Sequence, residues 1–441
     1  MLSVIGPEDF SPKLALAEAL ATPRRDAPLF LYSWPAPATE AWRLLAALPE
    51  EEGHYLATSE GESAGVGVVR RWVASGPGRG ERLADEAGRW LREALVSSLP
   101  GSSPPRPRLY GSLGFEADAA DSADFVLPRW RYERTARGAR LSVAVRGGEG
   151  DRLQAELERI WSTFTGSRPP LPAPHTQTRA ADPGPFLRSV AELTQRMANG
   201  ELQKVVLSRD VRVQAQDPID GLAVLVRLPP PPATGATFGF RRRGEWFLGA
   251  TPEHLVLRRG QQLSTMALAG TAAHDADPAQ LLSSPKDRAE HAVVVEHVLA
   301  QLQALGASGR APASPEILAL KNVLHLYTPI HAELSSPLHL LALADRLQPT
   351  PAVAGAPLLA ALRAIAAAEG RPRGRYAGSV GWFDARGQGE LYVALRAATI
   401  KGREADCHVG VGLVAASTPE AEWQETEWKA RTMLEALGAG G

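Results

Sequence analysis

The stretch LQKVVLSRD at residues 202–210 alternates like a β-strand, yet it carries a lysine in the middle of an apolar run. In an extended strand Lys204, Val206 and Ser208 point to one face, and the residues between them point to the other. A lysine here can discourage pairing at a sheet edge, or it can extend its amine to water. It can also be a buried cation with a chemical role, and residues 202–210 alone leave these readings open.

The composition restricts the classes of protein that fit this chain. Its 441 residues can bury a large core, and this length suits two to three domains or one large α/β unit. Lys and Arg number 48 and Asp and Glu 49, which gives a net charge of −1. No part is a basic or acidic block, so we expect neither a nucleic acid nor a membrane surface as partner.

The single cysteine, Cys407, excludes an internal disulfide framework and a cysteine-based zinc cluster. The first 20 residues lack the basic and apolar regions of a signal peptide, and no stretch is long and apolar enough to cross a bilayer. These features predict a soluble, cytoplasmic protein.

Proline-rich sequence divides the chain unequally. Residues 166–181 combine proline with a lack of apolar periodicity, so we interpret them as a linker. Residues 1–165 contain strand-like runs and one amphipathic stretch, and we expect them to complete the sheet system of residues 182–441 rather than to form a separate domain. In the second part helices alternate with short β-rich runs, which predicts a mixed α/β fold. No repeat of fixed period is present.

Two predicted helices begin with carboxylates on one face. In the helix of residues 283–302, Ser284 is the expected cap, and Asp287, Glu290 and His291 share a side that continues into an apolar stripe. That side is therefore expected to be buried, and buried carboxylates need a cation or a proton.

The second helix, residues 417–434, places Glu422, Glu425 and Lys429 on one side. Four carboxylates from two helices suit Mg²⁺, which prefers hard oxygen ligands and keeps several waters. The alternative is that acidic first turns only complement the helix dipoles.

Three further segments carry candidate site residues. Glu253 follows Pro252 between a small-residue turn and a strand, so its backbone is well defined. Gly270 and Thr271 combine close backbone approach with a hydroxyl, and Gly410 lies in a glycine-containing strand. No dinucleotide-binding or P-loop glycine motif is present.

Taken in order, eight segments resemble the chorismate-using enzymes of menaquinone, siderophore and tryptophan biosynthesis, and within that family the isochorismate synthases. The resemblance covers about residues 182–437. The segments are LQKVVLSR (202–209), GATPEHLVL (249–257), ALAGTA (267–272), SSPKDRAEH (283–291), LHLYTPI (324–330), LQPTPAVAGAP (347–357), RYAGSVGWFDARGQGELYVALRAA (375–398) and VGVGLVAASTPEAEWQETEWKARTML (409–434). A fainter similarity runs through LYGSLGFEAD and FVLP before residue 165.

The resemblance implies roles for the two groups that move protons. Lys204 matches the base that activates water, and Glu253 matches the general acid that protonates the departing hydroxyl at ring carbon 4 of chorismate while water adds at carbon 2. A lysine with an ordinary pKa of about 10.4 is protonated at neutral pH, so burial or nearby cations must favour its neutral form before it can act as a base.

The resemblance also implies the ligand-binding residues. Glu290 and Glu425 match the ligands of Mg²⁺, with Asp287 and Glu422 as nearby carboxylates. The remaining positions match groups that hold the substrate chorismate: Gly270, Thr271, His325, Tyr376, Arg396, Gly410 and Lys429.

Related activities remain as alternatives. A salicylate synthase would share the lysine, acid and metal positions but would also eliminate pyruvate. An aminating enzyme such as the large subunit of anthranilate or aminodeoxychorismate synthase would need a glutaminase partner, and Lys204 argues against it. A non-catalytic chorismate-binding relative has no need for both Lys204 and Glu253.

The resemblance implies the fold of anthranilate synthase component I, with large, mainly antiparallel sheets and helices packed outside. We expect no glutaminase partner, and either a monomer or a homodimer. The sequence leaves open whether the product feeds menaquinone or a siderophore.

Overall fold

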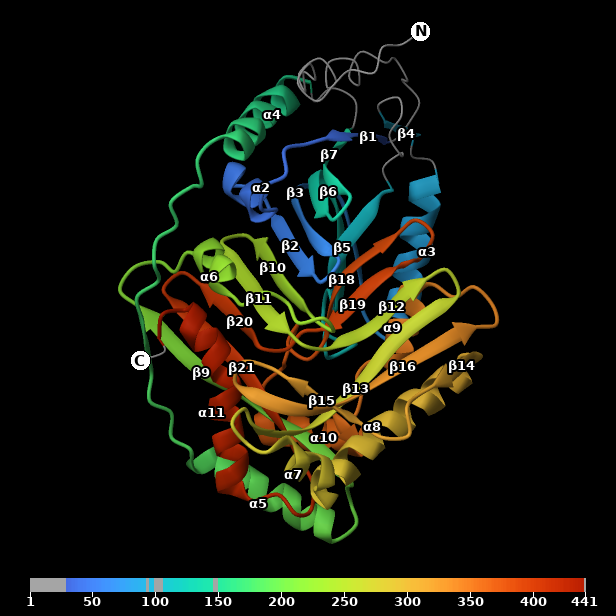
Figure 1. Ribbon diagram of the computed structural model, residues 1–441, viewed down its shortest axis with the longest axis vertical. Helices are drawn as coiled ribbons and strands as arrows, with labels where there is room; N and C mark the ends of the chain where they lie inside the picture. Colours follow the sequence, from blue (N-terminus) through green and yellow to red (C-terminus); the bar gives the residue numbers. More distant parts are fainter. Residues whose placement is uncertain (1–28, 93–94, 99–105, 146–149, 440–441) are drawn as a thin grey trace.

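The computed structural model describes residues 29–92, 95–98, 106–145 and 150–439. Residues 1–28, which belong to the predicted N-terminal part, lie outside the described residues. Figure 1 shows an elongated molecule whose early elements lie at one end and whose later helices gather at the other.

The N-terminal part is rich in strands, as its alternating runs predict. Its elements are β1 (Phe30–Pro35), α2 (Trp42–Ala47), β2 (Gly53–Thr58), β3 (Gly61–Ala74), α3 (Arg79–Arg92), β4 (Leu95–Ser98), β5 (Arg108–Leu113), β6 (Ala123–Thr135), β7 (Gly138–Val145) and α4 (Gly150–Thr165).

The second part alternates strands with helices. Its elements are β8 (Thr176–Thr178), α5 (Gly184–Ala198), β9 (Lys204–Ala215), α6 (Gly221–Arg227), β10 (Ala236–Arg242), β11 (Glu245–Thr251), β12 (His254–Arg259), β13 (Gln262–Ala273), α7 (Pro278–Ser283), α8 (Pro285–Ala304), β14 (Ala307–Arg310), β15 (Glu316–Ala319), β16 (Val323–Leu334), α9 (Leu340–Leu347), β17 (Gly355–Ala356), α10 (Leu358–Glu369), β18 (Ser379–Asp384), β19 (Gly389–Val393), β20 (Ala397–Lys401), β21 (Glu404–Leu413) and α11 (Pro419–Ala436).

Antiparallel pairing dominates the sheets, as predicted. Among the described strands the one parallel pair is β1 with β4. Two antiparallel pairs join the parts of the chain on either side of the proposed linker: β2 pairs with β10, and β5 pairs with β18. Strands from before residue 165 therefore extend sheets built by later strands.

The predicted linker, residues 166–181, contains a short strand. β8 pairs antiparallel with the far end of β9, and Thr176 also donates a hydrogen bond to the carbonyl oxygen of Leu437 at 2.9 Å. The proline-rich composition gives no sign of this strand, because its pairing depends on an edge supplied by β9.

Helices cover the outside of the later strands. α8 packs on β13, α11 on β21 and α10 on β9, and in Figure 1 these helices gather at the lower end of the molecule. The expected cap of α8 is confirmed, since the Ser284 hydroxyl accepts a hydrogen bond from the backbone N–H of Asp287 at 3.3 Å. α11 also contacts β13, the strand on which α8 packs.

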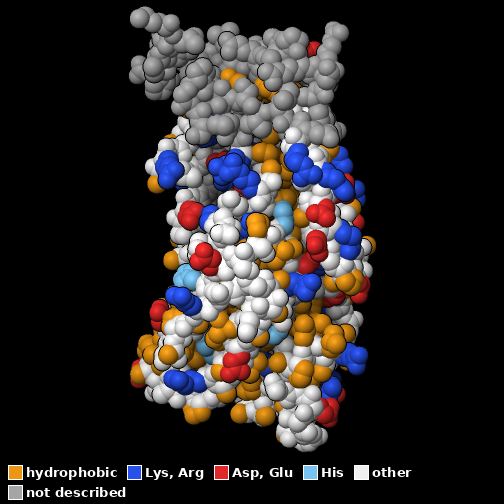
Figure 2. Space-filling view, turned by 90° about the vertical axis from the view of Figure 1, so that its right-hand side faces the viewer, with side chains coloured by type: hydrophobic (Ala, Val, Ile, Leu, Met, Phe, Trp, Pro, Cys, Tyr) orange, Lys and Arg blue, Asp and Glu red, His pale blue; other side chains and the backbone are white. Residues whose placement is uncertain are grey.

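The surface carries charges of both signs. In the space-filling view of Figure 2, basic and acidic side chains are interspersed over the visible face, with Lys and Arg more frequent toward the uppermost described part. Among the helices that the structure describes, none has the length and apolar character needed to cross a membrane.

Aromatic residues anchor the N-terminal core. Trp130 on β6 is fully buried, packs edge-on against Trp34 at a ring distance of 6.2 Å, and donates its indole N–H to Glu156 at 2.6 Å. Large buried rings of this kind contribute heavily to packing.

Replacing Trp130 tests whether the two parts unfold together. We expect Trp130→Ala to lower the free energy of unfolding by about 3–5 kcal/mol, the usual cost of truncating a buried aromatic residue. Because β2–β10 and β5–β18 join the parts, urea unfolding followed by circular dichroism should show one transition moved to lower urea. Two separate transitions, with only one of them shifted, would contradict a shared sheet.

Candidate active site

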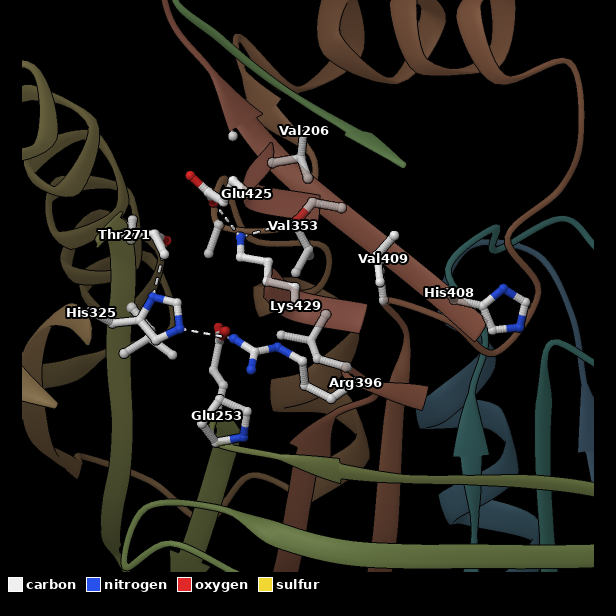
Figure 3. A pocket seen from close by; sticks show the side chains of 18 of the residues that line it. Val206, Glu253, Thr271, His325, Val353, Arg396, His408, Val409, Glu425 and Lys429 are labelled. Atoms are coloured by element: carbon white, nitrogen blue, oxygen red, sulfur yellow. Dashed lines mark hydrogen bonds and ion pairs between the residues drawn. The ribbon is translucent and has the colours of Figure 1, made fainter. Parts of the chain in front are cut away.

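A cavity, partly open to solvent, lies between β9, β13, β16, β21 and the helices α8 and α11. Most of the predicted site residues line it. They are Glu253, Gly270, Thr271, Glu290, His325, Tyr376, Arg396, Gly410, Glu425 and Lys429. In Figure 3 the side-chain ends of Glu253 and Arg396 lie beside each other, whereas the amine of Lys429 points toward Glu425. The three other predicted residues, Lys204, Asp287 and Glu422, lie outside the lining.

Lys204 begins β9 directly behind this lining. It is only 1% exposed, so the reading of a lysine that extends to water is wrong. β9 is also no edge strand at this end, because β17 pairs with it at Lys204 and Val205 and β21 pairs with it from Val205 onward. Its Nζ lies 2.8 Å from Oε1 of Glu290 without hydrogen-bond alignment, and Nζ has no other hydrogen-bond partner in the described part of the chain.

Gly412 on β21 allows this ion pair to form. A Cβ on Gly412 would lie 2.2 Å from Oε1 of Glu290 and 3.1 Å from Cε of Lys204. Any side chain there would displace the carboxylate. The glycine-containing strand therefore serves close packing of side chains from β9 and α8.

Glu253 occupies the turn between β11 and β12, directly after Pro252. The side chain is 3% exposed. Burial raises the pKa of Glu253 to about 8, although the positive charges of Lys204 and Lys429 oppose the shift. A carboxyl group of this kind holds its proton at neutral pH and can donate it.

Arg396 and His325 form a buried pair opposite Glu253. Arg396 Nη2 lies 2.9 Å from Nε2 of His325. A guanidinium can only donate, so Nε2 accepts and the proton of the neutral ring lies on Nδ1, which faces Thr271 Oγ1 at 3.1 Å and the carbonyl oxygen of Gly270 at 3.3 Å. Burial and the charge of Arg396 hold the pKa of His325 well below its usual value, which keeps the ring neutral.

The backbone at both sides of this pair has positive φ. Gly270 has a φ of 80° and interrupts the register of β13 with β16 between Ala269 and Thr271. Arg396 has a φ of 49°, which is uncommon for a residue other than glycine and costs free energy. Burial lowers the pKa of Arg396 to about 10, so the guanidinium stays charged at neutral pH.

The middle of α11 supplies a second cation. Lys429 pairs with Glu425 one turn earlier at 2.6 Å, and its Nζ donates to the carbonyl oxygen of Gly410 at 3.1 Å. Tyr376 lies beside this strand, and a Cβ on Gly410 would come within 2.9 Å of its hydroxyl oxygen. Two cations and a phenol hydroxyl thus meet on one side of the cavity, an arrangement that can bind a carboxylate.

The carboxylates of α8 and α11 lie close enough to influence one another. Burial and the nearby negative charge of Glu425 raise the pKa of Glu422, and burial and the charge of Glu290 raise that of Asp287. Oε2 of Glu422 is buried without a hydrogen-bond partner, while Oε1 lies 3.1 Å from Nζ of Lys286. This surplus of negative oxygen donors suits a divalent cation.

The carboxylates of α8 and α11 do not form a preassembled metal cluster. In the described part of the chain, no three His, Cys, Asp or Glu side chains already converge as a metal cluster. Mg²⁺ commonly binds through one or two carboxylates and keeps water for its other positions, so Glu290 and Glu425 match the ion's chemistry without such a cluster.

Sequence reasoning missed Arg373 and His408, which also line the cavity. Arg373 forms a buried ion pair with Glu369 at 2.5 Å. His408 contacts Asp210 at 2.7 Å, and its ring lies 5.3 Å from that of Tyr376. The stretch RPRGR around Arg373 shows no periodicity, and nothing in the sequence signals that it folds back over β9.

Comparison with known proteins gives a consistent result. The family model described as "Chorismate binding enzyme" matches residues 15–438. Isochorismate synthase DhbC of Bacillus subtilis is 38% identical over 272 residues, which cover 58% of this chain and 68% of that protein.

Solved structures agree with these matches. The menaquinone-specific isochorismate synthase MenF of Escherichia coli superposes with a TM-score of 0.78 at 28% identity, over 96% of this chain and 99% of the other. Anthranilate synthase component I of Streptococcus pneumoniae superposes with a TM-score of 0.63 at 20% identity, over 98% and 99%. The second likeness concerns the fold alone, and it confirms the fold predicted from the sequence.

The raised pKa of Glu253 predicts how stability depends on pH. Between the unfolded pKa of roughly 4.3 and about 8, the folded chain keeps a proton that the unfolded chain releases, so the wild type loses stability as pH rises. Glu253→Gln lacks this loss. In urea unfolding from pH 5 to pH 8, the free energy of unfolding of the variant should therefore rise relative to that of the wild type by up to about 1.4 kcal/mol per pH unit. A constant difference across this range would contradict the shift.

Proposed function

Because the chain belongs to the family of chorismate-binding enzymes, we propose that it is an isochorismate synthase, which converts chorismate to isochorismate. Water adds at ring carbon 2, the ring double bonds shift, and the hydroxyl leaves from carbon 4. The proposal draws on the resemblance of the site segments and on the activity that the matching relatives are named for.

The observation that carries the proposal is the buried carboxyl group of Glu253, whose pKa burial raises to about 8. A hydroxyl leaves poorly unless it is protonated as its bond breaks, and an acid with a pKa of about 8 holds its proton at neutral pH. Since Glu253 lines the same cavity as Arg396 and Lys429, a bound anion would lie within reach of the acid.

Lys204 is the proposed base. Its side chain is buried, and its Nζ lies 2.8 Å from Oε1 of Glu290 in an ion pair. The role as base therefore requires the carboxylate of Glu290 to release Lys204 when substrate binds. An amine freed in this way would have no other hydrogen-bond partner among the described residues and could accept a proton from water.

The two carboxylates of chorismate need different partners. Arg396, Lys429 and Tyr376 would hold the side-chain carboxylate, because a guanidinium and an ammonium offer several donors to one anion. Gly270, Thr271 and His325 lie on the other side of Arg396, beside the proposed position of the carbon 4 hydroxyl.

Glu290 and Glu425 are the proposed ligands of Mg²⁺, with Asp287 and Glu422 as neighbouring carboxylates. When bound, the ion would supply positive charge that attracts the ring carboxylate into an otherwise acidic part of the cavity. The unpaired oxygen of Glu422 and the raised pKa values of Glu422 and Asp287 support this assignment, because excess negative charge needs compensation.

The activity can be tested with purified protein, chorismate and Mg²⁺ alone. Proton NMR should show isochorismate forming without ammonia, glutamine or a second chain. Because the hydroxyl only changes its position on the ring, isochorismate should also regenerate chorismate. Salicylate with pyruvate, or an aminated product that needs ammonia, would contradict the proposal.

The proton-transfer roles predict severe losses of activity. We expect Lys204→Ala and Glu253→Gln each to lower kcat by about 10²-fold or more, because each removes a group that acts in the transition state. Binding of chorismate, measured by calorimetry, should weaken much less. Lys401→Ala, a change at an exposed lysine on β20, serves as the control with unchanged kcat. A kcat above about a tenth of the wild-type value in either variant would exclude its role.

The metal assignment predicts a change in the Mg²⁺ requirement. Glu290→Gln and Glu425→Gln should each raise the Mg²⁺ concentration for half-maximal activity, since each removes one anionic ligand. EDTA should abolish the activity of the wild type, and added Mg²⁺ should restore it. Glu420→Gln changes an exposed carboxylate in the first turn of the same helix as Glu425, so it tests the helix-dipole alternative and should leave the midpoint unchanged. Unchanged midpoints in all three variants would remove the metal assignment.

A further inference from the structure

The loop of residues 371–378, between α10 and β18, contributes side chains to the cavity. Arg373 and Tyr376 both line it. The loop is irregular, with positive φ at Gly374 and Ala377, so its backbone groups need partners outside regular secondary structure. The placement of Arg373 and Tyr376 therefore depends on whatever binds this backbone.

Glu116, in the connection between β5 and β6, binds two successive amides of the loop. Its Oε1 accepts from the backbone N–H of Arg373 at 2.8 Å, and its Oε2 accepts from that of Gly374 at 3.0 Å. Phe115 adds a third contact, donating its N–H to the carbonyl oxygen of Gly374 at 2.7 Å. Hydrogen bonds to a charged acceptor are stronger than neutral ones, and two from one carboxylate fix an orientation.

We call the hydrogen bonds of Glu116 and Phe115 to Arg373 and Gly374 the clamp. Further contacts connect the clamp to the walls of the cavity. The Arg373 guanidinium lies over the ring of Phe115 at 4.5 Å and donates to the carbonyl oxygens of Val353 and Val206, each at 2.7 Å. Val206 belongs to β9, two residues after Lys204. Holding the backbone of Arg373 thus also ties the loop to the strand that carries the proposed base.

A second residue of the same loop is anchored to the same part of the chain. Arg375 donates to the hydroxyl of Ser112 on β5 at 3.3 Å and lies 3.6 Å from the carboxylate of Asp124 on β6. Tyr376 follows directly in sequence. The contacts of Glu116 and Arg375 therefore hold the loop from both sides of its turn.

We propose that Glu116 is a positioning residue for the active site, contributed by the N-terminal part of the chain. It does not line the cavity, and it acts through Arg373 and Gly374 to hold Tyr376 where an anionic ligand binds. The inference rests on the proposed function for its kinetic test only, because the clamp itself can be measured without a substrate.

Kinetics of three variants separate positioning from stability. Glu116→Ala should raise KM for chorismate about tenfold, the scale typical of residues that orient a binding group, with a smaller effect on kcat. Glu116→Gln retains one carbonyl acceptor and should restore much of the loss. Asp118→Ala changes an exposed carboxylate on the same connection and serves as the control. An unchanged KM in Glu116→Ala, measured below its melting temperature, would overturn the proposal.

Hydrogen exchange monitors the clamp itself in the absence of chorismate. In Glu116→Ala the peptide covering residues 371–378 should exchange about tenfold faster or more, as expected when amides lose a charged acceptor. Asp118→Ala should exchange like the wild type. Equal exchange in all three proteins would refute the clamp. If the wild type fails to convert chorismate but Glu116→Ala exchanges faster, the proposed activity fails while the clamp remains.

Discussion

The site depends on the burial of opposite charges beside a carboxyl group that stays neutral. Lys204 with Glu290 and Lys429 with Glu425 form ion pairs at the cavity, whereas Glu253 is desolvated and forms no ion pair with any residue that the structure describes. In surroundings with little water, a group without a close counter-charge adopts its neutral form. Burial therefore favours a protonated Glu253 and tight ion pairs in the same cavity.

This arrangement needs both parts of the chain. Glu253 and the cations come from the later strands and helices, but Glu116 and Asp124 of the N-terminal part hold the loop that carries Tyr376. The pairing of β5 with β18 brings these segments together. The N-terminal strands thus pair with later strands and also contribute to the geometry of the site.

The sequence predicted the elements whose signals are local and missed those that depend on distant contacts. Alternation in residues 202–210 and the Ser284 cap were sufficient to predict β9 and the start of α8. The sequence around Lys204 did not reveal that this lysine is buried, because its position depends on Gly412 and Glu290, which lie far along the chain. Glu116 gave no signal, because its partners are backbone amides of a loop more than 250 residues away.

The proposed chemistry requires Glu253 to hold its proton at neutral pH. Infrared difference spectra of the wild type against Glu253→Gln would show its carboxyl C=O stretch directly. We expect a protonated carboxyl band at neutral pH that disappears with a midpoint near pH 8. A carboxylate band that is already complete at pH 6 would contradict it, because an ionised Glu253 could not protonate a leaving hydroxyl.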